Sequence, residues 1–183
     1  MANLQPHFTL RAIVNGRPVE AEIEPRDLLL DFLRDRLGLT GAKRSCDMQV
    51  CGACTVLVDG LPVSACCTLA YEARGRDVLT IEGLAQAGGP VGLQGSASTA
   101  PSGVGALHPL QEAFVHHAAV QCGFCTAGMI LSAKHLLDEE PHPSREAIRR
   151  YLKGNLCRCT GYWNILEAIE AAAQRMGGDA EPP

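Results

Sequence analysis

The stretch Cys46-Asp-Met-Gln-Val-Cys51-Gly-Ala-Cys54 sets three thiols at the spacing C-x4-C-x2-C, and a fourth thiol follows at Cys66. Three cysteines on one loop with one more further along the chain is the ligand spacing of a plant-type [2Fe-2S] cluster. Gly52 lies between two of the thiols, where the lack of a side chain allows unusual backbone angles and brings amides close to sulfur. The sequence therefore predicts a loop that wraps one side of an iron–sulfur cluster, with Cys66 approaching from the other side.

A structural zinc site is the alternative for these four thiols, although zinc modules more often use two paired C-x2-C arms. The sequence also leaves a choice between Cys66 and Cys67 as the fourth ligand. Adjacent residues on an extended strand point to opposite sides, so only one of the two can face the cluster. We expect Cys66 to be the ligand and Cys67 to be a small buried apolar residue.

Four more thiols follow in two short pairs, Cys122-Gly-Phe-Cys125 and Cys157-Arg-Cys159. Taken alone, two such pairs fit either zinc or an iron–sulfur cluster. The C-x-C pair is unusual for zinc, and a second cluster nearby would give each cluster an electron-transfer partner. This group is therefore interpreted as a second iron–sulfur site, so that eight of the nine cysteines are predicted ligands.

Alternating apolar residues and turn dipeptides predict a small α+β domain over residues 1–83. The dipeptides Asn15-Gly16 and Asp59-Gly60 indicate tight hairpin turns, because these residues accept positive φ. Leucines spaced on one helical face predict an amphipathic helix between the two hairpins. The expected elements are a hairpin over residues 8–24, a helix over 25–38, a hairpin over 55–64 and a strand over 78–81.

The rest of the chain is predicted to be a linker followed by helices. Residues 84–107 are rich in glycine and serine and bury little, which is typical of a linker. The apolar periodicity then predicts a four-helix domain over residues 108–176 and a flexible tail over 177–183. The four helices are expected at residues 108–121, 126–137, 144–154 and 162–176, with Ser144 as an N-cap.

Composition excludes several classes of protein. The formal net charge is −4 and the basic residues are scattered, so neither nucleic acid nor a membrane surface is an expected partner. The N-terminal residues do not read as a secretion signal and no apolar run is long enough to span a membrane, so a soluble cytoplasmic protein is expected. A reducing compartment disfavours disulfides and an odd number of cysteines cannot pair fully, so metal chemistry is the first expectation for clustered thiols, with redox enzymes and zinc modules still open. No nucleophile motif or catalytic carboxylate pair is present, so no catalytic residue is predicted.

Four stretches resemble one known family, the two-cluster iron–sulfur subunit of the molybdenum hydroxylases, a group that includes xanthine dehydrogenase, aldehyde oxidoreductase and carbon monoxide dehydrogenase. The resemblance is collinear over residues 7–176. It implies a ferredoxin-like β-grasp domain followed by a four-helix bundle, each with one [2Fe-2S] cluster. The matching stretches are residues 51–60, 107–114, 121–129 and 154–162.

The resemblance also implies partners and roles. A large subunit would carry a molybdopterin cofactor and perform the substrate chemistry, and a medium subunit would carry FAD, in a dimer of heterotrimers. The cluster of Cys122, Cys125, Cys157 and Cys159 would then lie near the pterin, and the cluster of Cys46, Cys51, Cys54 and Cys66 nearer the flavin. Gln121 matches a position whose side chain approaches the pterin cofactor.

One departure from the family pattern concerns the first cluster loop, where Gln49 replaces a glycine or small residue found in many relatives. It puts the geometry of the loop in doubt rather than cluster binding. Two other functions stay open from the sequence: an independent two-cluster ferredoxin-type carrier and a zinc-stabilised interaction module. The substrate and the final electron acceptor are not encoded in this chain.

Overall fold

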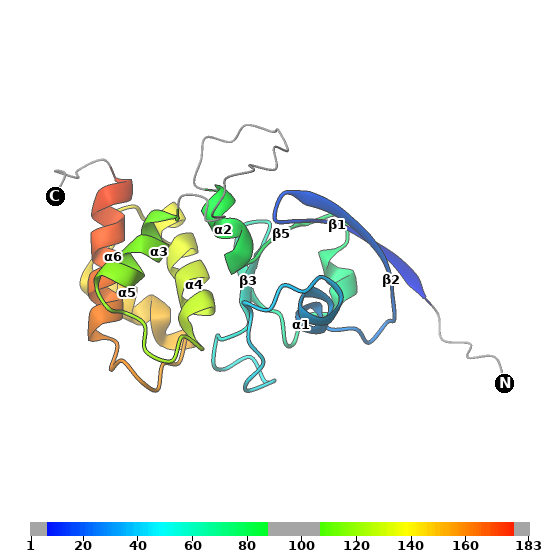
Figure 1. Cartoon of the computed structure of the whole chain (residues 1–183), viewed down its shortest axis with the longest axis horizontal. Coiled ribbons are helices and arrows are strands. Elements are labelled where there is room, and N and C mark those ends of the chain that lie inside the picture. Colours follow the sequence, from blue (N-terminus) through cyan, green and yellow to red (C-terminus); the bar gives the residue numbers. More distant parts are fainter. Residues whose placement is uncertain (1–6, 88–106, 178–183) are drawn as a thin grey trace, which may run out of the picture.

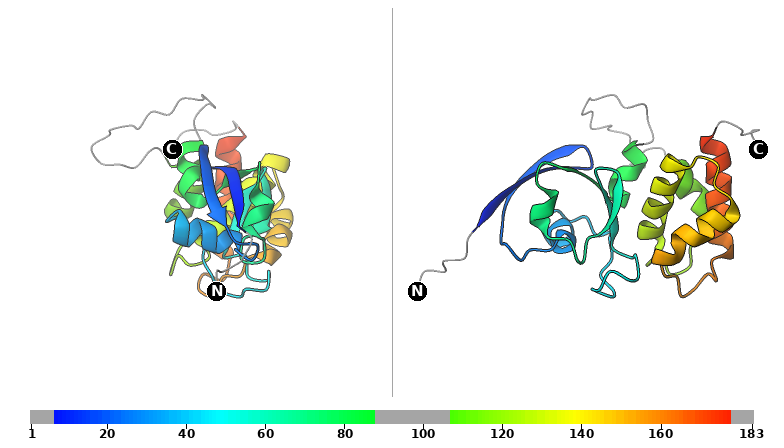
Figure 2. Two further views of the ribbon diagram at one scale, coloured as in Figure 1. Left: turned by 90° about the vertical axis from the view of Figure 1, so that its right-hand side faces the viewer. Right: turned by 180° about the vertical axis from the view of Figure 1, so that it is seen from behind.

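The computed structural model describes residues 7–87 and 107–177, which form a mixed β-sheet domain and a helical domain (Figure 1). The right-hand view of Figure 2 shows the sheet at one end of the molecule and helices α3 to α6 at the other, whereas the left-hand view looks along the axis that joins them. This arrangement confirms the predicted fold class, an α+β ferredoxin-like domain followed by a helical domain.

The sheet has five strands in the order β2-β1-β5-β3-β4. Both predicted hairpins are present, and their turns use positive φ at Asn15, Gly16, Asp59 and Gly60. Strand β5 is parallel to β1 and antiparallel to β3, so it joins the two hairpins into one sheet. The strands are β1 (Phe8–Val14), β2 (Arg17–Ile23), β3 (Thr55–Val58), β4 (Leu61–Ser64) and β5 (Asp77–Leu79).

The helix expected over residues 25–38 is shorter than predicted and changes its type. It begins as α1 (Leu29–Asp31) and continues as the π-helix η1 (Phe32–Arg36), in which the amide of Leu37 donates to the carbonyl of Phe32 at 3.2 Å. Apolar periodicity does not distinguish these two hydrogen-bonding patterns. The buried side chains of this helix pack on the sheet and form the core of the ferredoxin-like domain.

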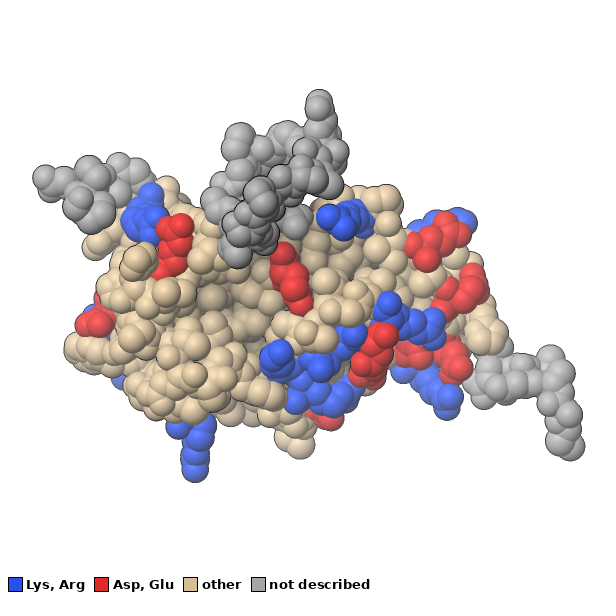
Figure 3. All heavy atoms as spheres, in the orientation of Figure 1, with Lys and Arg blue, Asp and Glu red and all other residues tan. Residues whose placement is uncertain are grey.

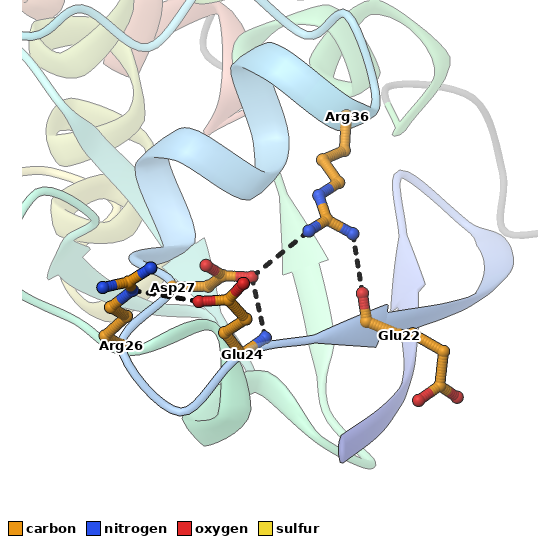
Figure 4. A network of polar contacts seen from close by, with 5 residues as sticks. All are labelled: Glu22, Glu24, Arg26, Asp27 and Arg36. Atoms are coloured by element: carbon orange, nitrogen blue, oxygen red, sulfur yellow. Dashed lines mark hydrogen bonds and ion pairs between the residues drawn. The ribbon is translucent and has the colours of Figure 1, made fainter. Parts of the chain in front are cut away.

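A polar network ties the end of this helix to strand β2 (Figure 4). The Asp27 carboxylate accepts from the backbone amide of Glu24 at 3.0 Å and from Arg36 at 3.5 Å. Arg36 also donates to the backbone carbonyl of Glu22 at 2.6 Å. These contacts are partly exposed, so they orient the helix more than they stabilise it.

A short helix, α2 (Ile81–Ala87), occupies the start of the predicted linker. The boundary expected at residue 83 is therefore wrong, because Leu84 is fully buried and packs into the core of the helical domain. The remainder of the predicted linker, residues 88–106, and the predicted tail from residue 178 onward lie outside the described residues. Two small elements, η2 (Ala70–Ala73) and β5, complete the sheet domain before α2.

The helical domain contains the four predicted helices, but the first of them is shorter than expected. Helix α3 ends at His116 because Ala118 adopts a left-handed conformation with φ of 50°, and Val115 in its last turn is exposed. The other three helices follow the prediction, and Ser144 caps α5 through the amide of Ala147 at 3.2 Å. The helices are α3 (Pro109–His116), α4 (Thr126–Glu139), α5 (Arg145–Tyr151), continued by η3 (Leu152–Gly154), and α6 (Trp163–Met176).

The two domains share strand β3, which is buried on both faces. Val56 and Val58 belong to the core of the ferredoxin-like domain, whereas Leu57 points the other way and packs with the helical core. Alternation of side chains along one strand thus serves two cores at once. Within residues 7–87 and 107–177, no helix is long and apolar enough to cross a membrane.

Candidate metal centres

The first predicted cluster loop has a backbone shaped around one sulfur atom. The amides of Val50 and Cys51 both donate to Cys46 Sγ at 3.4 Å. Amide donors from Met48, Val50 and Cys51 lower the pKa of the Cys46 thiol to about 6, which favours the thiolate that binds metal. The loop reaches this geometry through positive φ at Asp47, Gln49 and Gly52.

Gln49 is therefore the departure from the family pattern that matters to this loop. Its φ of 60° lies in the left-handed region, which glycine adopts without strain. A residue with a side chain costs about 1–2 kcal/mol there. The loop adopts this left-handed conformation with glutamine in place, so the departure from the family pattern adds strain to the loop.

Two of the four thiols of the first group, Cys54 and Cys66, are buried. Cys54 lies in the core beside Cys66, and burial raises the pKa of the Cys54 thiol to about 12. A thiol in such a site keeps its proton unless a cation replaces it. The pair therefore has the surroundings of a metal ligand rather than of a reactive cysteine.

Cys67 is exposed, which corrects the expectation that it is a buried apolar residue. Its sulfur lies 3.6 Å from Cys66 Sγ instead of on the opposite side of the chain. The reason is that β4 ends at Ser64, and the amide of Cys67 donates to the Ser64 carbonyl at 2.9 Å to close a turn. The alternation of side chains assumed for a strand does not apply to a turn.

The second group of thiols gathers where three elements of the helical domain meet. Cys122 and Cys125 lie in the bend that precedes α4, and Cys157 and Cys159 lie in the loop between η3 and α6. The sulfur of Cys159 donates to that of Cys122 at 3.5 Å, across the two loops. Folding of the bundle thus brings together the two pairs that are distant in the sequence.

Local donors distinguish the thiols of this second group. Burial raises the pKa of Cys125 to about 12. Burial also acts on Cys157, but the hydroxyl of Thr160 at 3.1 Å and its amide at 3.4 Å outweigh that effect and lower the pKa of Cys157. The amide of Phe124 lowers the pKa of Cys122.

The second loop is held by residues that the sequence analysis did not single out. Tyr162 adopts a left-handed φ of 69°, and its hydroxyl accepts from the amide of Cys157 at 2.8 Å and donates to the carbonyl of Asn155 at 3.3 Å. Thr160 and Tyr162 directly follow the Cys157-Arg-Cys159 pair, and this adjacency to the predicted ligands was the available signal. Gln121 is exposed and directly precedes Cys122.

The four thiols of each group lie as two pairs. A [2Fe-2S] cluster has two irons that share four protein ligands, whereas zinc takes four ligands around one point. The pairs are Cys46 with Cys51, Cys54 with Cys66, Cys122 with Cys159, and Cys125 with Cys157. Two pairs of thiols in each group match the four ligands that the two irons of a [2Fe-2S] cluster share.

Comparison with known proteins matches both halves of the chain to iron–sulfur families. Residues 12–78 match the 2Fe-2S iron-sulfur cluster binding domain, and residues 80–170 match the [2Fe-2S] binding domain. The chain is 45% identical over 164 residues to the nicotine 6-hydroxylase small subunit of Paenarthrobacter nicotinovorans, covering 90% of this chain and 88% of the relative. It is 42% identical over 168 residues to the nicotinate dehydrogenase small FeS subunit of Eubacterium barkeri, covering 92% and 96%.

A solved structure shows the same fold over nearly the full chain. Quinoline 2-oxidoreductase from Pseudomonas putida 86 contains a chain that is 42% identical, with a TM-score of 0.78. The match covers 95% of the present chain and 99% of that chain. Sequence and structure comparisons therefore agree on one family across both domains.

Proposed function

Because this chain belongs to the two-cluster iron–sulfur subunits of the molybdenum hydroxylases, we propose that its eight paired cysteines bind one [2Fe-2S] cluster in each domain. The chain is an electron-transfer subunit of an oxidoreductase whose substrate chemistry lies on a partner. Each cluster, when bound, takes up and releases one electron at a time. The protein supplies the thiolates, the amide donors and the burial that tune this chemistry.

The pairing of the thiols is the observation that carries the assignment of ligands. The sulfur of Cys66 also lies 3.6 Å from that of Cys67, and the burial of Cys66 beside Cys54 favours Cys66 over the exposed Cys67 as the fourth ligand of the first group. Cys46, Cys51, Cys54 and Cys66 would hold the cluster of the ferredoxin-like domain. Cys122, Cys125, Cys157 and Cys159 would hold the cluster of the helical domain. Amides already point at Cys46 Sγ and Cys157 Sγ, as expected for sulfurs that carry negative charge.

We further propose that the cluster of the helical domain faces the subunit that carries molybdopterin. Cys122 and Cys159 are exposed, and Phe124, Leu156 and Trp163 are large apolar side chains left exposed on the same cluster-bearing segments. Figure 3 shows that one face of this domain carries few charges, whereas charges of both signs crowd the ferredoxin-like domain. An apolar rim around exposed ligands supports contact with a protein partner rather than with water.

Three further proposals follow from this orientation. Gln121, exposed and next to Cys122, would reach the pterin cofactor. The ferredoxin-like cluster, rimmed by the exposed Met48 and Val50, would deliver electrons to an FAD subunit or an external acceptor. The complex would be a dimer of heterotrimers, made of large, medium and small subunits.

The substrate class of the complex and its cellular compartment are also proposals. Relatives named for nicotine, nicotinate and quinoline make nitrogen heteroaromatic compounds the first class to test as substrates of the complex. We place the complex in the cytoplasm, because all nine cysteines are free and a reducing compartment keeps them so. Cell fractionation with an antibody to the chain tests this location.

Serine variants of the purified complex test the assignment of ligands. Cys125→Ser is expected to lose one of two electron paramagnetic resonance (EPR) signals and substrate-driven turnover, while the other signal stays. Cys67→Ser, the matched control outside both quartets, is expected to keep both signals. Full turnover in Cys125→Ser would contradict the proposal, and loss of a signal in Cys67→Ser but not in Cys66→Ser would reassign the fourth ligand of the first cluster.

A further inference from the structure

We propose that Asn155 is a positioning residue that clamps the two cluster loops together and thereby sets the coupling between the clusters. The inference rests on the proposed function, since it assumes a cluster on each loop. Asn155 contributes no thiolate and lies outside both quartets. What distinguishes it is a side-chain bond from one cluster loop to the other.

The bond joins residues that flank ligands of different clusters. Asn155 Nδ2 donates to the backbone carbonyl of Gly52 at 3.3 Å, and this contact is buried. Gly52 lies between the ligands Cys51 and Cys54, and Asn155 precedes the ligand Cys157 by two positions. Asn155 is only 5% exposed and is one of few buried polar residues among those described, so its amide is held in this place by the fold.

A backbone hydrogen bond runs beside this clamp. The amide of Leu156 donates to the carbonyl of Cys51 at 2.8 Å. A path of bonds therefore leads from the ligand Cys51 to the ligand Cys157 that contains one hydrogen bond, and all its other links are covalent. The length of that bond depends on how closely the two loops are held, and Asn155 holds them one residue away.

The two cluster loops are also closely packed against each other at Gly52. A Cβ on Gly52 would overlap the Asn155 side chain and the Gly154 carbonyl, and a Cβ on Gly128 of α4 would overlap the Gly52 carbonyl. The Gly52 carbonyl accepts further from Thr55, from its amide at 3.2 Å and from its hydroxyl at 2.8 Å. Thr55 belongs to the same domain as Gly52, so Asn155 supplies the polar contact from the opposite domain.

Asn155 is equally fixed on its own side of the boundary. Its carbonyl accepts from the Tyr162 hydroxyl, which also accepts from the amide of Cys157. A shift of the Gly52 peptide is thus passed to the loop of the second cluster through one buried side chain. Loss of that side chain frees the two loops to separate while leaving every thiol in place.

The experiment compares Asn155→Ala and Asn155→Asp with the control Asn164→Ala in the full chain, purified with its partners. Asn164 also donates its side-chain amide to a backbone carbonyl, that of Ala118 at 3.4 Å, but on the exposed surface away from Gly52. Aspartate keeps the shape of asparagine and replaces the donor with a negative oxygen facing a carbonyl. Iron and sulfide content, EPR spectra of the reduced clusters, and deuterium exchange of the segment 155–157 are measured for each.

Both Asn155 variants are expected to keep two clusters. Loss of the buried bond should raise the rate of deuterium exchange at the Leu156 amide roughly tenfold. A factor of ten in the population of the open, exchanging state corresponds to about 1.4 kcal/mol, which is within the range that one hydrogen bond contributes. The magnetic interaction between the two reduced clusters should weaken in the same variants, and electron equilibration between them should slow. Asn164→Ala should match the wild type in all three.

The outcomes separate this inference from the proposed function. A wild-type complex without two distinct iron–sulfur signals would overturn the proposed function itself. Two intact clusters with unchanged exchange and unchanged magnetic interaction in both Asn155 variants would overturn the clamp alone. Loss of a cluster in Asn155→Ala and Asn155→Asp would also overturn it, because Asn155 would then be needed for cluster binding rather than for coupling.

Discussion

The hydroxyl of Tyr162 is predicted to decide how firmly the helical domain holds its cluster. In Tyr162→Phe the half-buried amide of Cys157 loses its acceptor at 2.8 Å, and the carbonyl of Asn155 loses a donor at 3.3 Å. An unsatisfied buried donor costs about 1–3 kcal/mol, and the second, longer bond contributes about 0.5–1.5 kcal/mol. We expect the free energy of unfolding to fall by roughly 2–3 kcal/mol, since both groups are only partly buried.

The assay follows the two clusters separately. The reduced complex is exposed to an iron chelator, and the EPR signal of each cluster is recorded over time. Tyr162→Phe should speed the loss of one signal by roughly 30- to 100-fold, because each 1.4 kcal/mol corresponds to a factor of ten, and should leave the other signal unchanged. Tyr71→Phe is the matched control, because its exposed hydroxyl accepts from Arg74 at 3.1 Å in the other domain. Equal loss of both signals, or no change in Tyr162→Phe, would refute the reasoning.

Three further changes test separate parts of the account. Gln49→Gly should stabilise the holo-protein by up to about 1 kcal/mol in denaturant unfolding, because relief of left-handed strain exceeds the added entropy of the unfolded chain; a loss of stability would contradict this. Leu84→Ala should cost about 2–5 kcal/mol, whereas the exposed Leu107→Ala should change stability by under about 0.5 kcal/mol; equal effects would show that α2 does not join the helical core. The wild type should lose free energy of unfolding as the pH falls below about 6.5, and His108→Asn should not show this loss. Parallel pH profiles of stability for the two proteins would refute the role of His108.

The sign of the His108 effect follows from its place as the N-cap of α3. Burial lowers the pKa of His108, and its Nδ1 accepts from the amide of Leu110 at 3.2 Å, so the folded protein holds the neutral imidazole. Below the ordinary pKa of about 6.5 the unfolded chain takes up a proton first, and stability falls with pH until the folded form also protonates. Asparagine is a good N-cap that does not titrate in this range.

Features that depend on neighbours in the sequence were predictable. The turns at Asn15-Gly16 and Asp59-Gly60 need positive φ, and the residue types alone indicate it. Ser144 caps α5 for an equally local reason. The spacing C-x4-C-x2-C predicts a loop that surrounds a sulfur, and the amides of that loop do point at Cys46.

Features that depend on contacts between residues distant in the sequence were not predictable from it. The burial of Leu84 arises from the helical domain, which the glycine-rich composition around it conceals. Cys67 is exposed because the strand ends at Ser64, a boundary that the alternating pattern does not mark. The bond from Asn155 to Gly52 joins residues from different domains, and no spacing rule links them.

Iron and acid-labile sulfide per chain, measured with EPR on the anaerobically purified and reduced complex, test the central claim most directly. The account predicts two [2Fe-2S] clusters per chain with two distinguishable signals, in agreement with the two paired sets of thiols. Stoichiometric zinc, absence of sulfide, or a single cluster per chain would contradict it.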